Sequence, residues 1–208
     1  MPKLPDPPDV AALAAIPPAI ATLAPSSQLY RIYFQAGPHP TTWDAFRTWG
    51  PTGSRFDPHE PPPCVQPDRA VLYAAGDLPT CLAEVYQDFR VVNRARAAPA
   101  LVGFHPSRPL RLLDLTGTWI TRVGASGAIA TGPRDRARRW ARALHAAYPD
   151  VDGLLYRSSM NGAGLCTALW SPAQDALPAS PALHRRLDDP VLHATLRVTC
   201  AKIGYALF

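Results

Sequence analysis

The sequence predicts an α+β fold, with a single domain at residues 28–208 and a Pro- and Ala-rich N-terminal arm at residues 1–27. Strand patterns are interspersed with short helical patterns without a regular βαβ rhythm, and no glycine-rich turn follows an early strand, which argues against a doubly wound nucleotide-binding fold. The 25 prolines against 13 glycines indicate many fixed turns and few long helices. A chain of 208 residues is long enough for one domain with a sizeable core.

The composition is that of a soluble globular chain, with 47% hydrophobic and 18% charged residues. The formal net charge is +5, and nearly all of the 21 basic residues are Arg. Because the planar guanidinium binds phosphate and carboxylate through paired hydrogen bonds, we expect an anionic ligand. No run of Lys interleaved with aromatic residues is present, so the charge alone does not indicate direct binding of nucleic acid.

The cysteines and histidines do not indicate a metal site. The four cysteines lie far apart without a C-x-x-C spacing, and the six histidines form no H-x-x-x-H pair, so we expect no zinc. Pro17 and Pro18 interrupt the apolar N-terminal stretch, and no later stretch approaches the ~20 apolar residues of a membrane span. We therefore expect a cytoplasmic protein with reduced thiols that does not enter a membrane.

The first elements can be placed from their boundaries. A short helix is predicted at residues 9–16, capped by Asp9 and stopped by Pro17. The stretch "QLYRIYF" at residues 28–34 has the β-branched and aromatic residues of a strand, which would carry Arg31. Residues 50–68 are dense in Gly, Pro and Asp and must form a loop, and a loop of this length inside a domain is usually functional or disordered.

A strand, a turn and a helix follow in "RAVLYAAGDLPTCLAEVYQDF" at residues 69–89, with the turn at Gly76 and an N-cap at Asp77. The apolar residues of this helix recur at spacings of four, three and four, so they are predicted to form its buried stripe: Leu78, Leu82, Val85 and Phe89. Glu84 lies on the flank of that stripe. The helix would therefore present a carboxylate beside its buried face.

The second half of the domain shows several further strand patterns and one helical pattern. Strands are predicted in residues 100–106 and 110–116, and a helix at residues 134–148 turns Ala137, Trp140, Ala141, Leu144 and Tyr148 inward and most of its arginines outward. The stretch "DGLLYRS" at residues 152–158 is a strand that enters a glycine-containing loop before the apolar run "LCTALW" at residues 165–170. Residues 193–208 are expected to supply a terminal strand.

Four polar residues interrupt or follow these apolar elements: Arg31, Arg55, Glu84 and Ser158. Each has an ordinary structural explanation, because a strand Arg or a helical Glu usually faces solvent and a Ser after a strand usually caps a turn. Tyr33 lies on the same strand face as Arg31, where core packing and ligand contact are equally open. Singly, none of these residues identifies a site.

Together, in this order, the segments resemble the RES domain family, named for an arginine, a glutamate and a serine. The stretch "LYRIY" looks like the family's opening strand with its arginine at Arg31, and "GSRFDP" looks like the following G-R-W-N type segment with Arg55 as its arginine. Phe56 and Asp57 depart from the commoner Trp and Asn of that segment. An acidic Asp57 would oppose pyrophosphate binding unless it points away or pairs with an Arg.

The other two segments carry the glutamate and the serine. In "VLYAAGDLPTCLAEVY" a tyrosine precedes the glutamate by eleven residues, which matches Tyr73 and Glu84. In "DGLLYRSSMNGAGLCTALW" Ser158 matches the serine, with Ser159 as the adjacent competitor. The resemblance covers much of the chain.

The resemblance implies an ADP-ribosyltransferase-like core, similar to diphtheria-type toxins, with small mixed and antiparallel sheets and short helices. It also implies a toxin of a toxin–antitoxin pair, held inactive by an antitoxin with a helix-turn-helix domain. The implied activity is that of an NAD glycohydrolase or phosphorylase, which cleaves the nicotinamide–ribose bond of NAD. NAD would be the substrate, inorganic phosphate a possible co-substrate, and no prosthetic group or metal would be needed.

The residue types suit this chemistry, because nicotinamide leaves NAD as a neutral molecule and needs no general acid, so one carboxylate can suffice. Glu84 would stabilise the oxocarbenium-like ribose, while Arg31 and Arg55 would bind the pyrophosphate and one of them would recruit an acceptor phosphate. Tyr73 offers a face for stacking on nicotinamide. Ser158 would hydrogen-bond the ribose or the amide, since no His or Lys is placed to activate it as a nucleophile.

Two alternatives stay open at the level of the sequence. A mono-ADP-ribosyltransferase would leave label from NAD on a specific protein target. A noncatalytic module would use its Arg-rich surface to bind nucleic acid or a partner, with salt-sensitive binding that is indifferent to Glu84→Gln.

Overall fold

A computed structural model describes residues 3–208, so the first two residues of the predicted arm lie outside the described residues. The fold is a mixed α+β structure built on an eight-stranded sheet with the order β1-β8-β9-β10-β5-β2-β7-β11. Within this sheet the β8–β9 pair is parallel and the other pairs are antiparallel. In the same order, the strands span Ile20–Leu23, Leu110–Asp114, Gly153–Arg157, Leu165–Trp170, Val71–Ala75, Leu29–Phe34, Pro99–Phe104 and Leu183–Arg186.

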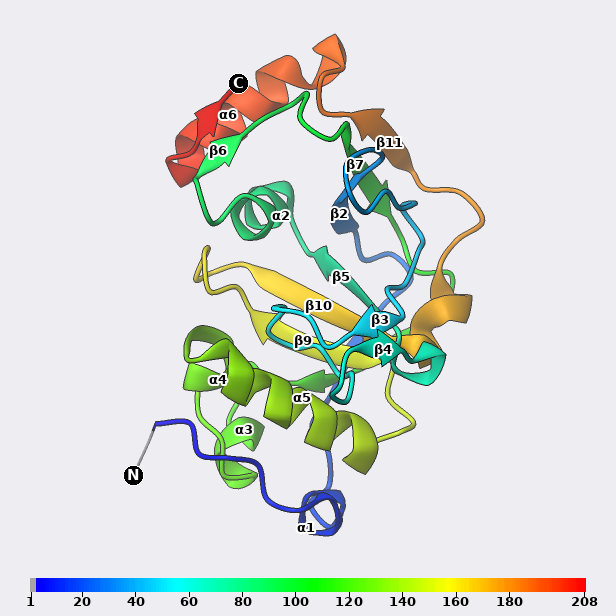
Figure 1. The fold of residues 1–208 in the computed structure, drawn as a ribbon, viewed down its shortest axis with the longest axis vertical. Helices are drawn as coiled ribbons and strands as arrows, with labels where there is room; N and C mark the ends of the chain where they lie inside the picture. The colour runs from blue at the N-terminus through cyan, green and yellow to red at the C-terminus, as the bar shows by residue number, and fades with distance from the viewer. Residues whose placement is uncertain (1–2) are drawn as a thin grey trace.

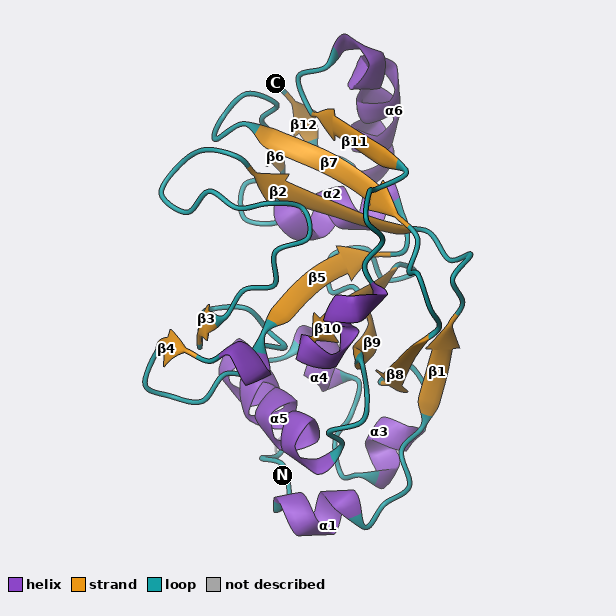
Figure 2. Ribbon diagram, turned by 90° about the vertical axis from the view of Figure 1, so that its right-hand side faces the viewer, coloured by secondary structure: helices purple, strands orange, loops and turns teal. Residues whose placement is uncertain are grey.

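The sheet is divided between β5 and β2, which share the single pair Tyr30 and Ala75. By contrast, β5 pairs with β10 over five positions and β2 pairs with β7 over six. Figure 2 shows the result: β2, β7 and β11 lie on one side of β5 with α2 and α6, and β8 to β10 lie on the other side with α3, α4 and α5. The two halves diverge from this one point of contact, which leaves room for a cavity between them.

Helices and small sheets complete the fold (Figure 1). The α-helices α1 to α6 span Val10–Ala14, Leu78–Val85, Trp119–Arg122, Ala128–Thr131, Arg134–Ala147 and His193–Ile203, and the 3-10 helices η1 to η3 span Pro67–Arg69, Ser171–Ala176 and Pro190–Leu192. Two small sheets pair β3 (Trp49–Gly50) with β4 (Cys64–Val65) and β6 (Val91–Val92) with β12 (Ala206–Leu207). In the part of the chain that the structure describes, no helix has the length and apolar character to cross a membrane.

Most of the predicted elements are confirmed. The strand that carries Arg31 is β2, the helix capped by Asp77 is α2, and the Asp77 carboxylate accepts a hydrogen bond from the Thr80 N–H at 2.7 Å. The inward face predicted for the long helix is buried in α5 and just beyond its end: Ala137, Trp140, Ala141, Leu144 and Tyr148. Apolar periodicity was sufficient here because this face packs into the main core.

The predicted arm lies against the rest of the fold. Asp9 caps α1 by accepting from the Ala12 N–H at 2.7 Å, and β1 pairs with β8 at the edge of the large sheet. Aromatic side chains donate hydrogen bonds to carbonyl oxygens of this segment: Trp140 to Pro5, Tyr148 to Leu13 and Trp119 to Pro17. These contacts link the segment to α3 and α5, while its separation as a unit from the domain at residues 28–208 stays a prediction.

Two predictions are wrong. The stripe on α2 is not buried beyond Leu82, because Val85 is 37% exposed and Phe89 is 84% exposed. The helix ends at Val85, and a residue with positive φ, Arg90, soon redirects the chain. Residues 193–203, expected as a strand, form α6, and the segment reaches an extended conformation only in β12. Leu196 and Cys200 are both buried one helical turn apart, so packing against α2 overrides the β-branched content.

Candidate active site

A cavity of about 490 Å³ lies where β5 and β2 diverge. Its walls come from these two strands, from α2, from the loop at residues 52–55 and from the start of α5. Four of the five residues singled out in the sequence line it: Arg31, Arg55, Tyr73 and Glu84. Ser158 does not line it but contacts Glu84, so the structure brings all five to one place from four separate parts of the chain.

The Glu84 carboxylate is held in a fixed position. Glu84 lies near the end of α2, and its Oε1 accepts a hydrogen bond from the Ser158 hydroxyl at 2.5 Å and another from the Ser159 N–H at 3.1 Å. Hydrogen bonds to a charged acceptor are about twice as strong as neutral ones, so both contacts hold the carboxylate firmly in position. Within residues 3–208, Oε2 receives no hydrogen bond and is left available to a ligand.

The turn that carries Ser158 is braced against α2. The Ser158 oxygen accepts from the N–H groups of Met160 and Asn161 at 3.0 and 2.9 Å, and the Asn161 amide donates to Thr80 Oγ1 at 2.8 Å. A Cβ added at Gly164 would lie 2.0 Å from Thr80 Oγ1, so the backbone approaches α2 too closely for any larger residue. The close approach accounts for Gly164, and the side-chain hydrogen bonds account for Ser158 and Asn161.

Arg31 is a cation that forms no ion pair within residues 3–208. Its Nη2 donates to the Ala45 carbonyl oxygen at 3.3 Å, and its buried Nε makes no hydrogen bond within the described residues. Burial lowers the pKa of the Arg31 guanidinium to about 10, so the group stays protonated at neutral pH although its charge is poorly solvated. A buried donor of this kind is costly unless a ligand supplies an acceptor.

Arg55 reaches the cavity from the long loop and is anchored to the opposite wall. Its Nη1 donates to the Gly132 carbonyl oxygen at 2.5 Å. The pKa of Arg55 is lowered, first by burial and then by the positive charge of Arg134. Like Arg31, Arg55 has no carboxylate within 4 Å among residues 3–208, so the cavity holds more positive charge than its one carboxylate, Glu84, can balance.

Tyr73 presents a half-buried ring to the cavity from β5. Burial raises the pKa of its phenol above the ordinary value, so the hydroxyl stays protonated at physiological pH. That hydroxyl makes no hydrogen bond within the described part of the chain. For Tyr33 the sequence left core packing and ligand contact as alternatives. In the structure Tyr33 is a core residue, and its hydroxyl lies 2.6 Å from His184 Nε2.

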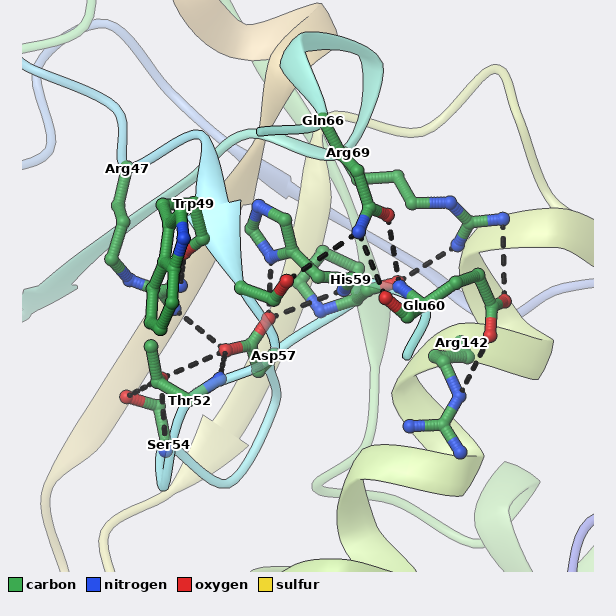
Figure 3. Close-up of polar contacts among 12 residues, drawn as sticks. Arg47, Trp49, Thr52, Ser54, Asp57, His59, Glu60, Gln66, Arg69 and Arg142 are labelled. Carbon is green, nitrogen blue, oxygen red and sulfur yellow. Dashed lines mark hydrogen bonds and ion pairs between the residues drawn. The ribbon is translucent and has the colours of Figure 1, made fainter. Parts of the chain in front are cut away.

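The departures from the family pattern at Phe56 and Asp57 have structural roles. Phe56 is fully buried and packs on Tyr156, with ring centroids 4.4 Å apart. Asp57 is also fully buried and pairs with Arg47 at 2.9 Å, as Figure 3 shows. The carboxylate that could have opposed an anionic ligand is thereby neutralised away from the cavity.

Asp57 is the centre of the hydrogen-bond network that shapes the loop. Its Oδ2 accepts from the Thr52 N–H at 2.6 Å and from Thr52 Oγ1 at 2.8 Å, and its Oδ1 lies 2.5 Å from His59 Nδ1 (Figure 3). Although burial acts in the opposite direction, the Thr52 backbone and Arg47 hold the pKa of Asp57 below its usual value. Thr52 and Arg55 both line the cavity, so this buried carboxylate positions one of its walls.

The cavity also contains residues that the sequence did not single out. Arg134 lines it from the first position of α5, and Gln87 lines it just after α2. Arg134 was expected on a solvated helix face, and only its position directly after a glycine–proline turn hinted at a different role. Cys81 and Cys166 line it as well, but burial raises the pKa of both thiols, that of Cys81 to about 12, so neither is a thiolate at neutral pH.

Comparisons with known proteins identify the family and the fold. A family model described as "RES domain" matches residues 28–190. One chain of the crystal structure of the M. tuberculosis MbcT–MbcA toxin–antitoxin complex has a similar fold, with a TM-score of 0.53 and 20% sequence identity over 91% of this chain and 96% of that chain. A search of curated proteins gives no match. At this level of identity, the structural likeness concerns the fold alone.

Proposed function

Because this chain belongs to the RES domain family, we propose that it is a toxin-type enzyme that cleaves the nicotinamide–ribose bond of NAD. The observation that carries the proposal is the Glu84 carboxylate, fixed through Oε1 by Ser158 and Ser159 inside a cavity that is also lined by three arginines. Within residues 3–208 none of these arginines forms an ion pair. A carboxylate suits a substrate that develops positive charge on its ribose, and the arginines suit a substrate that carries phosphate. NAD has both features.

In this proposal Glu84 acts by charge. As the C1′–N bond of NAD breaks, nicotinamide takes the bonding electrons and leaves as a neutral base, while the ribose becomes an oxocarbenium-like cation. The free Oε2 of Glu84 would stabilise that cation or hold a ribose hydroxyl, and a fixed charge of this kind requires no reorganisation during the reaction. Among the described residues that line the cavity there is neither a His nor a Lys, so Glu84 is the best-placed general base.

The other residues bind and position. Arg31 would bind the NAD pyrophosphate, and Arg55 would bind a phosphoryl group of either NAD or an acceptor phosphate. Each has N–H donors that make no hydrogen bond within the described part of the chain. Tyr73 would stack on nicotinamide. Ser158 is a positioning residue in this scheme, because its hydroxyl hydrogen is donated to Glu84 and its oxygen already accepts two N–H groups.

The divided sheet supports an ADP-ribosyltransferase-like core, in which two diverging halves enclose the dinucleotide. We also propose that a cognate antitoxin with a helix-turn-helix domain holds the protein inactive, since the solved structure of similar fold comes from a toxin–antitoxin complex. Loss of NAD would then inhibit growth. Induced expression of the protein without a partner should lower cellular NAD before growth stops, and growth arrest with normal NAD would contradict this part of the proposal.

Product identification tests the proposed chemistry. Purified protein is incubated with NAD, with and without inorganic phosphate, and the products are identified by mass spectrometry. Hydrolysis yields nicotinamide and ADP-ribose, and phosphorolysis yields nicotinamide and ADP-ribose 1″-phosphate. Intact NAD under all conditions would overturn the proposal, and retention of ADP-ribose on a lysate protein would instead identify a mono-ADP-ribosyltransferase.

A further inference from the structure

One wall of the cavity is formed by the corner between α4 and α5, residues 126–134, which we call the α4–α5 corner. It contributes Ala130 and Arg134 to the cavity lining. Its Gly132 carbonyl oxygen also accepts the hydrogen bond from Arg55 Nη1 at 2.5 Å. The corner therefore sets where two of the three arginines that line the cavity lie.

The α4–α5 corner has little structure that it could keep on its own. In the described part of the chain, α4 is a four-residue helix flanked by Gly127 and Gly132, and neither α4 nor α5 begins with a side-chain cap. A single helical turn is unstable in isolation, because the cost of nucleation exceeds the gain from its few hydrogen bonds. The conformation of the corner must therefore come from the segments that pack against it.

The start of the corner is joined to the N-terminal arm through Ser126. Its hydroxyl donates a hydrogen bond to the Lys3 carbonyl oxygen, and the hydroxyl oxygen accepts one from the Ala128 N–H at 3.2 Å. One side chain thus links the arm to the first residue of α4.

The first turns of α5, directly after the corner, are joined to the next three residues of the arm. The pairs are Arg136 Nη1 with the Leu4 carbonyl oxygen, Trp140 Nε1 with the Pro5 carbonyl oxygen, and Arg139 Nε with the Asp6 carboxylate, at 2.6, 2.8 and 2.6 Å. The Leu4 side chain is 2% exposed and belongs to the main core. Residues 3–6 therefore hold the corner on both sides, before α4 and after the start of α5.

A second group of arm contacts lies at the other end of α5. Leu13, on α1, is fully buried, and its carbonyl oxygen accepts a hydrogen bond from the Tyr148 hydroxyl at 2.6 Å. Tyr148 is the C-cap of α5, and the 14 residues of this helix, at about 1.5 Å each, place it about 20 Å from Arg134. Figure 1 shows the arm passing below α5 on its way to α1. The arm thus has one buried leucine near the cavity wall and one far from it.

We propose that residues 3–6 are positioning residues, which hold the α4–α5 corner so that Arg55 and Arg134 are placed to bind the anionic part of the substrate. This role rests on the proposed function of the cavity. None of residues 3–6 lines the cavity in the part of the chain that the structure describes, and the family model begins only at residue 28. Neither the cavity lining nor the matched family pattern therefore accounts for these contacts.

The role concerns substrate binding and not the chemical step. A guanidinium binds a phosphoryl group through paired hydrogen bonds of fixed geometry, and a displacement of about 1 Å can cost about 10²-fold. A shift of the corner would displace Arg55 and Arg134 in this way. The Glu84 carboxylate is fixed by Ser158 and Ser159, which lie outside the corner, so it would keep its position.

Leu4→Ala and Leu13→Ala form a matched pair, since each removes a buried leucine from the arm. Both should lower the Tm by about 4–20 °C, because each leaves a cavity in the core. Measured well below the Tm of each variant, Leu4→Ala should raise the KM for NAD about 10-fold or more and leave kcat within about twofold of wild type. Leu13→Ala should leave both constants near wild type. Equal KM values for the two variants would contradict the proposal.

A second pair of variants leaves the core intact and decides the question if Leu4→Ala does not fold. Arg136→Met removes the donor to the Leu4 carbonyl oxygen but keeps an aliphatic side chain, so the KM for NAD should rise about 2- to 10-fold. Arg138→Met is on the same helix and outside the arm contacts found within residues 3–208, so its KM should equal that of wild type. The same KM in both variants would exclude the positioning role.

Hydrogen exchange of backbone amides separates failure of this role from failure of the proposed function. In protein without NAD, the amides of residues 126–134 should exchange faster in Leu4→Ala and Arg136→Met than in Leu13→Ala, Arg138→Met and wild type. If this difference is seen while wild type leaves NAD intact, the arm positions the corner and the NAD reaction is wrong. If wild type cleaves NAD but the corner exchanges equally in all five proteins, the arm does not position it.

Discussion

Replacement of Ser158 by Ala should damage catalysis by releasing Glu84. The hydroxyl donates to Glu84 Oε1 at 2.5 Å, and a hydrogen bond to a charged group contributes about 1.5–3 kcal/mol. If that contact holds the carboxylate in place in the transition state, kcat for nicotinamide release should fall about 10- to 150-fold. KM for NAD should change little, because the contact does not involve the substrate.

The same substitution removes the acceptor of the Met160 and Asn161 N–H groups, so the free energy of unfolding should also fall, by about 1–3 kcal/mol. Rates must therefore be measured well below the Tm of the variant. The neighbouring Ser159→Ala variant provides the comparison, because Ser159 contacts Glu84 through its backbone N–H and Ala keeps that bond. Equal losses in the two variants, or full activity of Ser158→Ala, would refute the positioning role.

Three further predictions concern the scaffold. Asp57→Ala should lower the free energy of unfolding by about 3 kcal/mol and raise the KM for NAD, because it removes a fully buried carboxylate that holds the cavity loop. A thermal unfolding curve identical to that of wild type would contradict this prediction. Burial, and secondarily the charge of Arg69, lower the pKa of His145 to about 4. As the pH is lowered from 6.5 to 4, the unfolded chain therefore binds a proton that the folded protein does not, and the free energy of unfolding should decrease by at most about 3 kcal/mol. His145→Gln should reduce this pH dependence in denaturant titrations, and an unchanged pH dependence would exclude His145 as its source. Gly153→Ala should destabilise by at least about 2 kcal/mol, because φ is +147° and the new Cβ would lie 2.1 Å from the Ala168 carbonyl oxygen; a Tm equal to that of wild type would show that this strand can shift.

The parts of the fold that could be predicted are those with a strong local signal. The amphipathic face around Trp140 and the cap at Asp77 are properties of a few neighbouring residues, so the sequence contains them in full. Phe89 shows the limit of this reasoning, because the helical repeat continues in the sequence beyond the residue at which the chain turns away. The end of α2 depends on contacts with the C-terminal segment, whose helix was itself predicted as a strand.

The candidate site was predictable as a set of residues but not as an arrangement. The order of Arg31, Arg55, Glu84 and Ser158 matched a family pattern, whereas the hydrogen bond between Ser158 and Glu84 joins residues 74 positions apart. Arg134 was missed because in sequence it is one of several arginines on an amphipathic helix. Its position in the cavity follows from the packing of α5 on the side of β5 that holds β8 to β10, which no local pattern encodes.

The initial rate of nicotinamide release from NAD tests the central claim most directly, compared among wild type, Glu84→Gln and Glu60→Gln. Glu60 undergoes the same chemical change but lies outside the cavity lining, in surface ion pairs with Arg69 and Arg142. Loss of a charge fixed at the reacting centre costs about 3–4 kcal/mol, so Glu84→Gln should release nicotinamide about 10²- to 10³-fold more slowly than wild type, with Glu60→Gln close to wild type. Equal rates for all three proteins would contradict the assignment of Glu84 as the catalytic carboxylate.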